Sequence, residues 1–546
     1  MDEHTPVLIV GGGLCGLSAA TFLAWHGVPA TVVERRSGTL LHPRARAVNP
    51  RAMETLRGVG LAPAVLAGRS RVYDERSQRI KAATLAGPEL RPTSMAAPRS
   101  ADGSIGVSPC PWAPIDQDRL EVLLRAHAAE LGADVRFGTA LRSVEPAGPD
   151  WDGGVLAKIE DARGVRTVHA GHVVAADGYR SPLRRRLGIG HTGPGALGGS
   201  ANFTFTADLA PALRGRHLGV GHFDRPRPGT VLLPHDGSDR WVLGIPFDPS
   251  AGESLADFTP ERCADMVREA VGMPDLDVTI VPQLEDGTTV LAYEVEAKVA
   301  DRFRHGPFSF VGDAAHVVPP TGAFGASTGI QDAHNLAWKL AAVLRGHAGP
   351  GLLDSYEDER RRVALFTMEQ ALLQSRERTG RSVPLDPALK PVDTDLVVFG
   401  VTYRSSAVVL EDDLPAEVMA LPPAQLDGKP GTRAPHVWVR QSGAEVSVLD
   451  LFQRRPVLLA ASSGEPWARA AREAADEVGT EVDTFVVGRD VTEPAGRFAS
   501  AYGLGPEGAV LVRPDGFVAW RSPGAPPEPA GHRDVLTRTL RRVLSL

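Results

Sequence analysis

The first apolar segment of the chain ends in a cluster of glycines. Residues 7–10 are all apolar, and residues 11–16 read Gly-Gly-Gly-Leu-Cys-Gly. Small and apolar residues recur at 17, 19, 20 and 23, which is helical spacing, and a second apolar stretch over 30–33 is followed by Glu34. The pattern therefore predicts a buried strand, a tight turn, a helix and a second strand.

Three of these glycines have the Gly-x-Gly-x-x-Gly spacing of a dinucleotide-binding turn. In such a turn Gly11 makes the sharp bend, Gly13 lets the backbone approach a pyrophosphate, and Gly16 lets the helix pack closely on the strand. The helix start supplies free N–H groups and a partial positive charge. Glu34 lies 18 residues after Gly16, where a carboxylate can accept the ribose hydroxyl protons. We therefore predict a dinucleotide site here.

The rest of the chain divides by its pattern into further regions. Short strands over 134–175 continue the α/β pattern. Between 190 and 300, strand-like segments recur around a single helix, which predicts an inserted antiparallel sheet. A strand and a long helix at about 325–344 return to the α/β pattern. From about residue 437 a βαβ-like pattern resumes, and it predicts a separate small α/β domain.

Composition excludes several classes of function. The chain has 546 residues and a net charge of −7, so two to four domains are expected and nucleic acid is not an expected partner. No apolar run reaches the roughly 18 residues of a membrane span, and the apolar start follows Asp2 and Glu3, unlike a signal peptide. Three scattered cysteines form no CxxC pair and no metal spacing. We therefore expect a cytoplasmic protein without a metal centre.

Two basic or reactive features have ordinary explanations. The run Arg184–Arg186 is predicted to be the solvated face of a short helix rather than an anion site. Cys15 lies at a helix start, where the pKa of a thiol would fall. We nevertheless expect Cys15 to be a small packed residue.

Two later motifs join the glycine turn. Residues 177–184 read Asp-Gly-Tyr-Arg-Ser-Pro-Leu-Arg, and Gly312-Asp313-Ala-Ala-His is followed by Pro-Thr-Gly-Ala-Phe-Gly at 320–325. The three motifs together, in this order, resemble those of the group A flavoprotein aromatic hydroxylases, which share the p-hydroxybenzoate hydroxylase fold. Residues 320–340 look most like the tetracenomycin-type hydroxylases of aromatic polyketide biosynthesis. The resemblance covers nearly the whole chain.

This resemblance implies the fold class and the domains. The fold would be α/β and α+β, with a Rossmann-like FAD-binding domain, an inserted antiparallel-sheet substrate domain and a C-terminal thioredoxin-like domain. The expected boundaries are residues 1–180 and 300–375 for the FAD-binding domain, 181–299 for the substrate domain, 376–436 for a linker, and 437–546 for a thioredoxin-like domain without redox cysteines. Residues 70–115 are a candidate contribution to the substrate domain.

The resemblance also implies the cofactor site. FAD would lie on the glycine turn with its adenosine ribose on Glu34, the ribityl chain would bind Asp313, and a helix starting near Gly325 would stabilise negative charge on the reduced flavin. The expected cofactor residues are Gly11, Gly13, Leu14, Cys15, Gly16, Glu34, Arg35, Arg44, Gln117, Asp177, Gly312, Asp313, Pro320, Gly322, Gly325 and Ala326. Later copies of the glycine spacing follow no apolar strand, so NADPH or NADH is expected to dock transiently.

The implied reaction is aromatic hydroxylation by O₂ through a flavin C4a-hydroperoxide, in a site that excludes water. For the base that deprotonates a phenol, the sequence offers His222, His235 and Tyr293 as candidates, although each is individually more typical of a structural residue. Candidate substrate contacts are Trp241, Pro320 and Phe324, with Trp241 also typical of a buried sheet residue. The oligomeric state is not indicated.

Other functions share these motifs. Baeyer–Villiger oxygenation and inactivation of an antibiotic would use the same fold and cofactor. A non-catalytic role, with FAD as a structural group in a partner subunit, is the third alternative. The sequence of the inserted sheet predicts neither the identity of the substrate nor the position that is hydroxylated.

Overall fold

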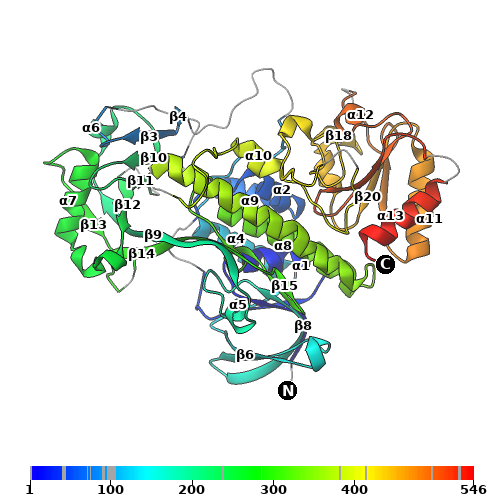
Figure 1. Ribbon diagram of the computed structural model, residues 1–546, viewed down its shortest axis with the longest axis horizontal. Coiled ribbons are helices and arrows are strands. Elements are labelled where there is room, and N and C mark those ends of the chain that lie inside the picture. The colour runs from blue at the N-terminus through cyan, green and yellow to red at the C-terminus, as the bar shows by residue number, and fades with distance from the viewer. Residues whose placement is uncertain are drawn as a thin grey trace.

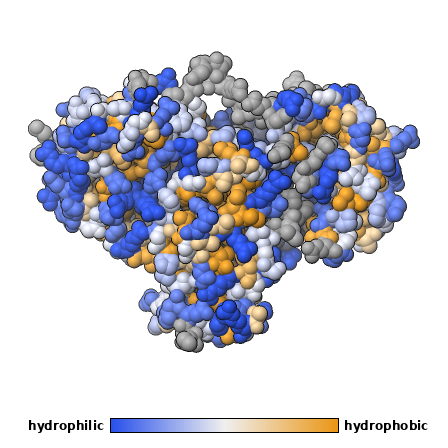
Figure 2. Space-filling model, turned by 180° about the vertical axis from the view of Figure 1, so that it is seen from behind, coloured by the Kyte–Doolittle hydropathy of each residue, from blue (hydrophilic) through white to orange (hydrophobic). Residues whose placement is uncertain are grey.

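The computed structural model shows a central body with a lobe of strands on one side and a C-terminal lobe on the other (Figure 1). The parts of the chain that it describes are residues 3–39, 45–70, 72–73, 76–88, 93–94, 106–235, 239–284, 286–379, 383–411, 415–493, 496–526 and 531–546. Seen from behind, apolar side chains gather over the central body, and hydrophilic ones cover much of the lobes (Figure 2).

An eight-stranded sheet forms the centre of the body, with the order β15-β16-β8-β1-β2-β5, with β7 paired to β8 and β6 paired to β7. Strands β16, β8, β1, β2 and β5 run parallel. Val10 of β1 and Phe310 of β16 both pair with Ala175 of β8, so the carboxyl ends of these strands meet at one edge. The strands are β1 (Glu3–Val10), β2 (Ala30–Glu34), β5 (Asp134–Phe137), β6 (Ala140–Pro146), β7 (Val155–Asp161), β8 (Gly164–Ala175), β15 (Arg304–His305) and β16 (Phe308–Phe310).

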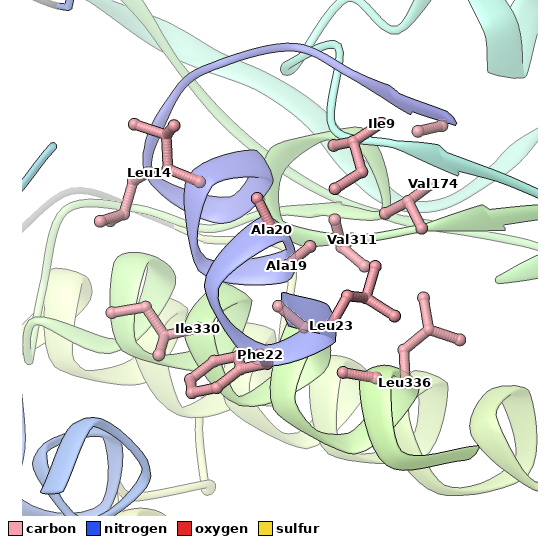
Figure 3. Close-up of a cluster of buried hydrophobic side chains, with 14 of the residues drawn as sticks. Ile9, Leu14, Ala19, Ala20, Phe22, Leu23, Val174, Val311, Ile330 and Leu336 are labelled. Carbon is pink, nitrogen blue, oxygen red and sulfur yellow. The ribbon is translucent and has the colours of Figure 1, made fainter. Parts of the chain in front are cut away.

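Helices cover this sheet and bury its apolar face. Side chains of β1 and β8 pack against α1, and α1 packs in turn on α8 through Phe22, Leu23, Ile330 and Leu336 (Figure 3). Such burial contributes about 25 cal/mol for each Å² of apolar surface removed from water. The helices of the body are α1 (Leu14–Trp25), α2 (Pro50–Gly58), α3 (Ala62–Ala67), α4 (Gln117–Glu130), α5 (Pro182–Arg186), α8 (Phe324–Leu344), α9 (Asp354–Thr379) and α10 (Thr394–Phe399).

A nine-stranded sheet forms the lateral lobe, with the order β17-β14-β9-β12-β11-β10-β3-β4 and with β13 beside β9. Its pairings are antiparallel except that of β3 with β10, which is parallel, a difference from the antiparallel sheet predicted. One face packs on α7. The elements are β3 (Gln78–Ala82), β4 (Thr93–Ser94), β9 (His191–Thr206), α6 (Ala210–Leu213), β10 (Leu218–Phe223), β11 (Thr230–Pro234), β12 (Arg240–Phe247), α7 (Pro260–Val271), β13 (Thr279–Val281), β14 (Val290–Ala300) and β17 (His316–Val317).

The C-terminal lobe contains a four-stranded mixed sheet of order β21-β20-β22-β23, with α11 and α13 packed together beside it. A two-stranded sheet of β18 and β19 precedes it. The elements are β18 (Trp438–Gln441), β19 (Ala444–Ser447), β20 (Val457–Ala460), α11 (Glu465–Val478), β21 (Asp483–Val486), α12 (Phe498–Ala501), β22 (Ala509–Val512), β23 (Val518–Ser522) and α13 (His532–Val543). No helix in the described parts is long and apolar enough to cross a membrane.

Candidate active site

The glycine turn has the close packing that its spacing predicts. Gly11 has a φ of +108°, and a Cβ built on it would lie 2.2 Å from the carbonyl oxygen of Ala176. A Cβ on Gly16 would lie 1.9 Å from the carbonyl oxygen of Gly11, so only glycine lets α1 start this close to β1. At Gly13 the nearest atoms to such a Cβ are 3.7 Å away. The turn itself therefore leaves the backbone open to close approach at Gly13.

Glu34 closes the turn from the end of β2. One oxygen of its carboxylate accepts the Gly12 N–H at 2.8 Å, and the other accepts the backbone N–H and the Nε of Arg36. Although burial opposes ionisation, these hydrogen bonds hold the pKa of Glu34 below its ordinary value. Arg35, which the resemblance assigned to the cofactor, is exposed, and its neighbour Arg36 forms the ion pair.

A second carboxylate, Glu121, was not predicted from the sequence. It lies on α4 and is fully buried, and its Oε1 accepts the Leu14 N–H at 3.0 Å and the side-chain amide of Gln117 at 2.8 Å. The other end of Gln117 accepts the N–H of Ala45 at 3.3 Å. Gln117 thus links the start of α1 to the segment that begins at Ala45. Arg44, a predicted cofactor residue, lies outside the described residues. The residue pattern of this helix did not indicate that Glu121 is buried or that it contacts the start of α1.

Asp177 has a local role in this structure. Its two oxygens accept the Ser181 hydroxyl at 2.6 Å and the Leu183 N–H at 3.0 Å, which organises the start of α5. Burial raises the pKa of Asp177 above its ordinary value. The carboxylate is occupied by these two donors, so its predicted contact with the cofactor remains a prediction.

The arginine run after Asp177 matches its prediction as a solvated face only in part, because Arg185 and Arg186 are exposed while Arg184 is not. Arg184 is 5% exposed, and its guanidinium donates to the carbonyl oxygen of Ala314 at 2.9 Å. This hydrogen bond ties the second motif to the third. Arg186 also donates inward, to the carbonyl oxygen of Val144. The sequence of a short arginine run does not show which side chains are buried. Their burial depends on carbonyl groups that accept their hydrogen bonds and that lie far away in the sequence.

The third motif packs directly on the first through Cys15. A Cβ on Gly312, whose φ is +58°, would lie 2.2 Å from the Cys15 sulfur, and one on Gly329 would lie 2.4 Å from it. Cys15 therefore fills the space between two glycines. The expected lowering of its pKa by the helix start is wrong, because burial and the nearby Asp313 raise the pKa of the thiol well above its ordinary value.

Asp332 on α8 holds the Gly312–Asp313 turn in place. One oxygen accepts the Gly312 N–H at 3.1 Å and faces His316 Nε2 at 2.6 Å, and the other accepts Arg360 Nε at 2.7 Å. All of these side chains are buried, and although burial opposes ionisation, the interactions with His316 and Arg360 lower the pKa of Asp332. The turn leaves the side chain of Asp313 half-buried at the sheet edge. Asp332 and Arg360 gave no sequence signal because their roles depend on this contact.

The loop over 320–326 connects this turn to α8. Gly322 and Ala323 have φ values of +69° and +52°, and α8 begins at Phe324 with no hydrogen bond from the side chain before it. Thr321 donates its hydroxyl to the carbonyl oxygen of Ala371 on α9 at 2.8 Å. Pro320 is exposed. The loop is therefore anchored to α9 while the first N–H groups of α8 remain uncapped by its own N-cap residue.

Two of the predicted substrate contacts are buried in cores. Phe324 is 2% exposed and packs with Ala371 and Phe399, facing α9 and α10. Trp241 is 6% exposed in the core between the nine-stranded sheet and α7, with its indole N–H on the carbonyl oxygen of Ala207. Each ring is already covered by protein in this structure, as the alternative interpretation of Trp241 as a buried sheet residue expects, and both substrate contacts stay predictions.

The three candidate bases lie on or directly after three different strands of the lateral sheet. Tyr293 is 42% exposed on β14, and His235 follows β11 at the end of a hairpin. His222 lies on β10, on the face of the sheet opposite α7, and its Nδ1 is buried without a hydrogen-bond partner. Burial and nearby cations lower the pKa of His222 to about 4. Of the three, His222 is the one whose ring has an unused buried nitrogen.

Comparison with protein-family models assigns both large parts of the chain. Residues 4–371 match a family described as an FAD binding domain, and residues 427–545 match the C-terminal domain of aromatic-ring hydroxylases. The chain belongs to the FAD-dependent aromatic hydroxylases. The resemblance drawn from the three motifs is thereby confirmed.

Relatives of this hydroxylase match it along the whole chain. It is 40% identical to the tetracenomycin A2 monooxygenase-dioxygenase of Streptomyces glaucescens, over 99% of this chain and 97% of the relative. It is 41% identical to a 4-methyl-5-nitrocatechol 5-monooxygenase of Burkholderia, over 100% of this chain and 98% of the relative. The crystal structure of aklavinone-11 hydroxylase with FAD and aklavinone matches with a TM-score of 0.91 and 38% identity over the full length of both chains. The mixed α/β fold is that of FAD-dependent hydroxylases.

The residues of the hydroxylase fit FAD. Neither α1 nor α8 is capped by the side chain of its own N-cap residue, and Gly13 admits close approach. Arg46 donates to Asp116 with its Nε, while its Nη2 is buried without a partner, which provides an unused donor beside Gln117. Buried donors without partners are uncommon in proteins and suit an anionic ligand.

Proposed function

We propose that this hydroxylase uses FAD, a reduced nicotinamide and O₂ to insert one oxygen atom into an aromatic ring of a polycyclic polyketide. The observation that carries the proposal is the packing of Gly312 on Cys15, which joins the glycine turn, the Gly312–Asp313 turn and the start of α8 at one sheet edge. When bound, FAD supplies the acceptor for the nicotinamide hydride and the centre that reacts with O₂.

The chain's own residues would hold the cofactor along this edge. The start of α1 and the Gly13 backbone would bind the pyrophosphate, with Leu14 already fixed by Glu121. Glu34 would accept the ribose hydroxyls, and Asp313 the ribityl chain. The start of α8, at residues 324–326, would stabilise negative charge on the flavin ring. Gly322, Gly325 and Ala326 leave little side chain between this backbone and the ring.

The nicotinamide would bind only during reduction. Within the described residues, only the turn at residues 11–16 has this glycine spacing, follows a strand and opens a helix, and the proposal assigns that turn to FAD. NADPH or NADH would therefore dock on a surface and leave. The aromatic substrate would lie against the lateral sheet, where water is excluded from the reacting ring.

The finer fold assignments belong to the same proposal. The parallel order β8-β1-β2 with α1 behind it supports a Rossmann-like domain. The mixed sheet β21-β20-β22-β23 with α11 and α13 supports a thioredoxin-like domain at 437–546. That domain cannot carry out dithiol chemistry, because all three cysteines precede residue 264. Its role would be structural or at a subunit interface.

Turnover in ¹⁸O₂ tests this function. The purified protein should be yellow, and an aromatic substrate should accelerate its NADPH or NADH oxidation. Mass spectrometry should show one ¹⁸O atom in a phenolic product. A protein that binds no FAD, or whose flavin is not reduced by either nicotinamide, would contradict the proposal.

A smaller substrate is the second candidate. It is favoured by the 41% identity to the 4-methyl-5-nitrocatechol monooxygenase, which is as high as the identity to the polyketide enzyme. A panel that contains both nitrocatechols and polycyclic quinones separates the two. The position of the ¹⁸O atom separates ring hydroxylation from Baeyer–Villiger insertion or antibiotic inactivation.

A further inference from the structure

The nine-stranded sheet has two unlike faces. Ile80, Leu232 and Leu243 point into the core against α7. The register places Arg79 and Lys81 of β3 beside Val220 and His222 of β10, on the opposite face. On the same face lie Val231, Leu233 and Val242 of the next two strands. This second face therefore combines an apolar area with a basic edge.

The C-terminal end of α9 closes over the basic edge. Lys81 Nζ lies 3.2 Å from the carbonyl oxygen of Glu377, and Arg378 follows at the next position. In Figure 1 this end of α9 reaches β10 and β11. Arg378 donates to the side-chain oxygen of Gln374 at 2.9 Å. Cations from helix α9 and from strand β3 thus lie around His222.

In the described part of the chain, these cations have no carboxylate within ion-pair distance. Among the described residues, no aspartate or glutamate forms an ion pair with Arg79, Lys81 or Arg378. Arg79 Nε and His222 Nδ1 are both buried without a hydrogen-bond partner. Burial and Arg79 lower the pKa of Arg378 to about 10. A buried charge without a counter-ion is costly, and an unused buried donor adds to that cost. An anion between these groups would remove both costs.

The distance to the cofactor loop suits a polycyclic ligand. Thr321 of that loop is bonded to Ala371 on α9, and Arg378 lies seven residues further along the same helix. Seven residues correspond to about 10 Å and nearly two full turns, so Ala371 and Arg378 share one face of α9. A span of this size matches three fused aromatic rings. One end of such a ligand would be at the loop and the other at the cations.

We propose that Arg79, His222 and Arg378 form an anion subsite that binds an acidic group of the aromatic substrate, distal to the ring that is hydroxylated. The acidic group is a carboxylate or an ionised phenol. The proposal rests on the proposed function and narrows its substrate class to acidic aromatics. Arg79 and Arg378 supply charge, and the neutral His222 donates from Nδ1. All three are specificity-determining residues, distant from the oxygen transfer.

Calorimetry on the FAD-loaded protein tests the subsite without requiring turnover. The probes are 1,8-dihydroxyanthraquinone-3-carboxylic acid, its methyl ester, 1,8-dihydroxyanthraquinone, and the dimethyl ether of that quinone. The variants are Arg378→Gln, Arg79→Gln and the charge-retaining Arg378→Lys. Arg376→Gln is the matched control, because Arg376 is on the same turn of α9 but donates to the carbonyl oxygens of Asp386 and Leu389.

The wild-type protein should bind the acid at least about 10-fold more tightly than the ester if a carboxylate is the ligand. If an ionised phenol is the ligand, the quinone should be favoured over its ether by a similar factor. Either preference should largely vanish in Arg378→Gln and Arg79→Gln, persist in part in Arg378→Lys, and persist fully in Arg376→Gln. Unchanged binding of the neutral partner, together with wild-type FAD content, shows that a variant is folded.

Equal affinity for both members of both pairs in the wild-type protein would overturn the subsite. An equal loss for acidic and neutral probes in the variants would overturn it as well. These results are distinguishable from failure of the proposed function, because flavin reduction by NADPH or NADH is measured separately on the same preparation. If the protein oxidises NADPH or NADH normally but binds acidic and neutral probes equally, the proposed function stands and the anion subsite is wrong.

Discussion

Arg513 in the C-terminal lobe and Glu359 on α9 form a bidentate ion pair in which both side chains are completely buried. The two guanidinium nitrogens lie 2.5 Å and 2.8 Å from the two carboxylate oxygens. Lys339 and Asn335 of α8 donate to the same carboxylate. Arg513 also binds Asp515 within its own hairpin. The hairpin between β22 and β23 is therefore inserted into the charged centre of the body.

Replacing Arg513 should destabilise the protein strongly. Arg513→Gln leaves the Glu359 and Asp515 carboxylates buried with fewer cations, and the loss of one partner from such a pair costs about 3–5 kcal/mol. Urea unfolding followed by circular dichroism measures the effect. Arg489→Gln in the same lobe is the control, because the Arg489–Glu465 pair is exposed and should contribute far less to the free energy of unfolding. Equal effects of the two variants would contradict the buried pair's importance.

Two glycines of the first motif should separate packing from cofactor binding. Gly16→Ala forces a Cβ to within 1.9 Å of the Gly11 carbonyl oxygen and should lower the melting temperature of the FAD-free protein. Gly13→Ala has no contact closer than 3.7 Å and should leave that temperature unchanged. It should nevertheless weaken FAD binding about 10-fold or more, by blocking the pyrophosphate. Gly58→Ala, with no atom within 4 Å, is the control.

Glu34 should contribute to FAD affinity through its charge. Glu34→Gln places an amide where the Gly12 N–H and the Arg36 side chain both need an acceptor. We expect FAD binding to weaken by about 10-fold, consistent with the loss of a charge-assisted hydrogen bond. Fluorescence titration of the FAD-free protein measures this. Arg35→Gln should bind FAD as the parent does, since Arg35 is exposed; a larger effect there would show that Arg35 contacts the cofactor.

The cofactor motifs could be predicted because their chemistry is local. Gly11, Gly16 and Glu34 act within one strand–turn–helix–strand unit, so their spacing carries their roles. Glu121 and Arg184 act on backbone groups that are distant in sequence. Phe324 and Trp241 were predicted to be near the substrate from their neighbours in sequence, but core packing decides where their rings point.

The pairing of the lateral sheet is a similar case. No strands were predicted within residues 70–115, because β3 and β4 are short and lack a strong alternating pattern. Their pairing with β10 depends on a parallel neighbour about 140 residues later in the chain, for which a local pattern holds no information. The resemblance assigned residues 70–115 as a candidate part of the substrate domain, but the pattern alone could not predict the strand and the sheet face on which Arg79 and Lys81 lie.

Stability should fall as the solution is acidified below neutral pH. The folded protein lowers the pKa of His26 to about 3 and that of His334 to about 4, in both cases chiefly through burial. Each ring stays neutral when folded but binds a proton when unfolded below pH 6.5. Each therefore costs up to about 1.4 kcal/mol per pH unit from 6.5 down to its folded pKa, and nothing above 6.5.

Melting temperatures measured from pH 8 to pH 4.5 check this dependence. His26→Gln removes one titrating group, so its curve should be shallower below pH 6.5 and parallel to that of the parent above it. A curve that is flat down to pH 4.5 in the parent would contradict neutral burial. Histidines with lowered pKa values near 4 that add to the same slope are His172, His222 and His436.

Helix α9 has a consequence for exchanging parts between related enzymes. Near its start Glu359 receives the C-terminal hairpin, at Ala371 it holds the cofactor loop, and at Glu377 it meets β3 of the lateral sheet. A chimaera that exchanges only the strands of the sheet would place them against a foreign helix end and a foreign set of charges. The part that must be exchanged is discontinuous in sequence. It comprises residues 190–300, the β3–β4 segment and the last two turns of α9.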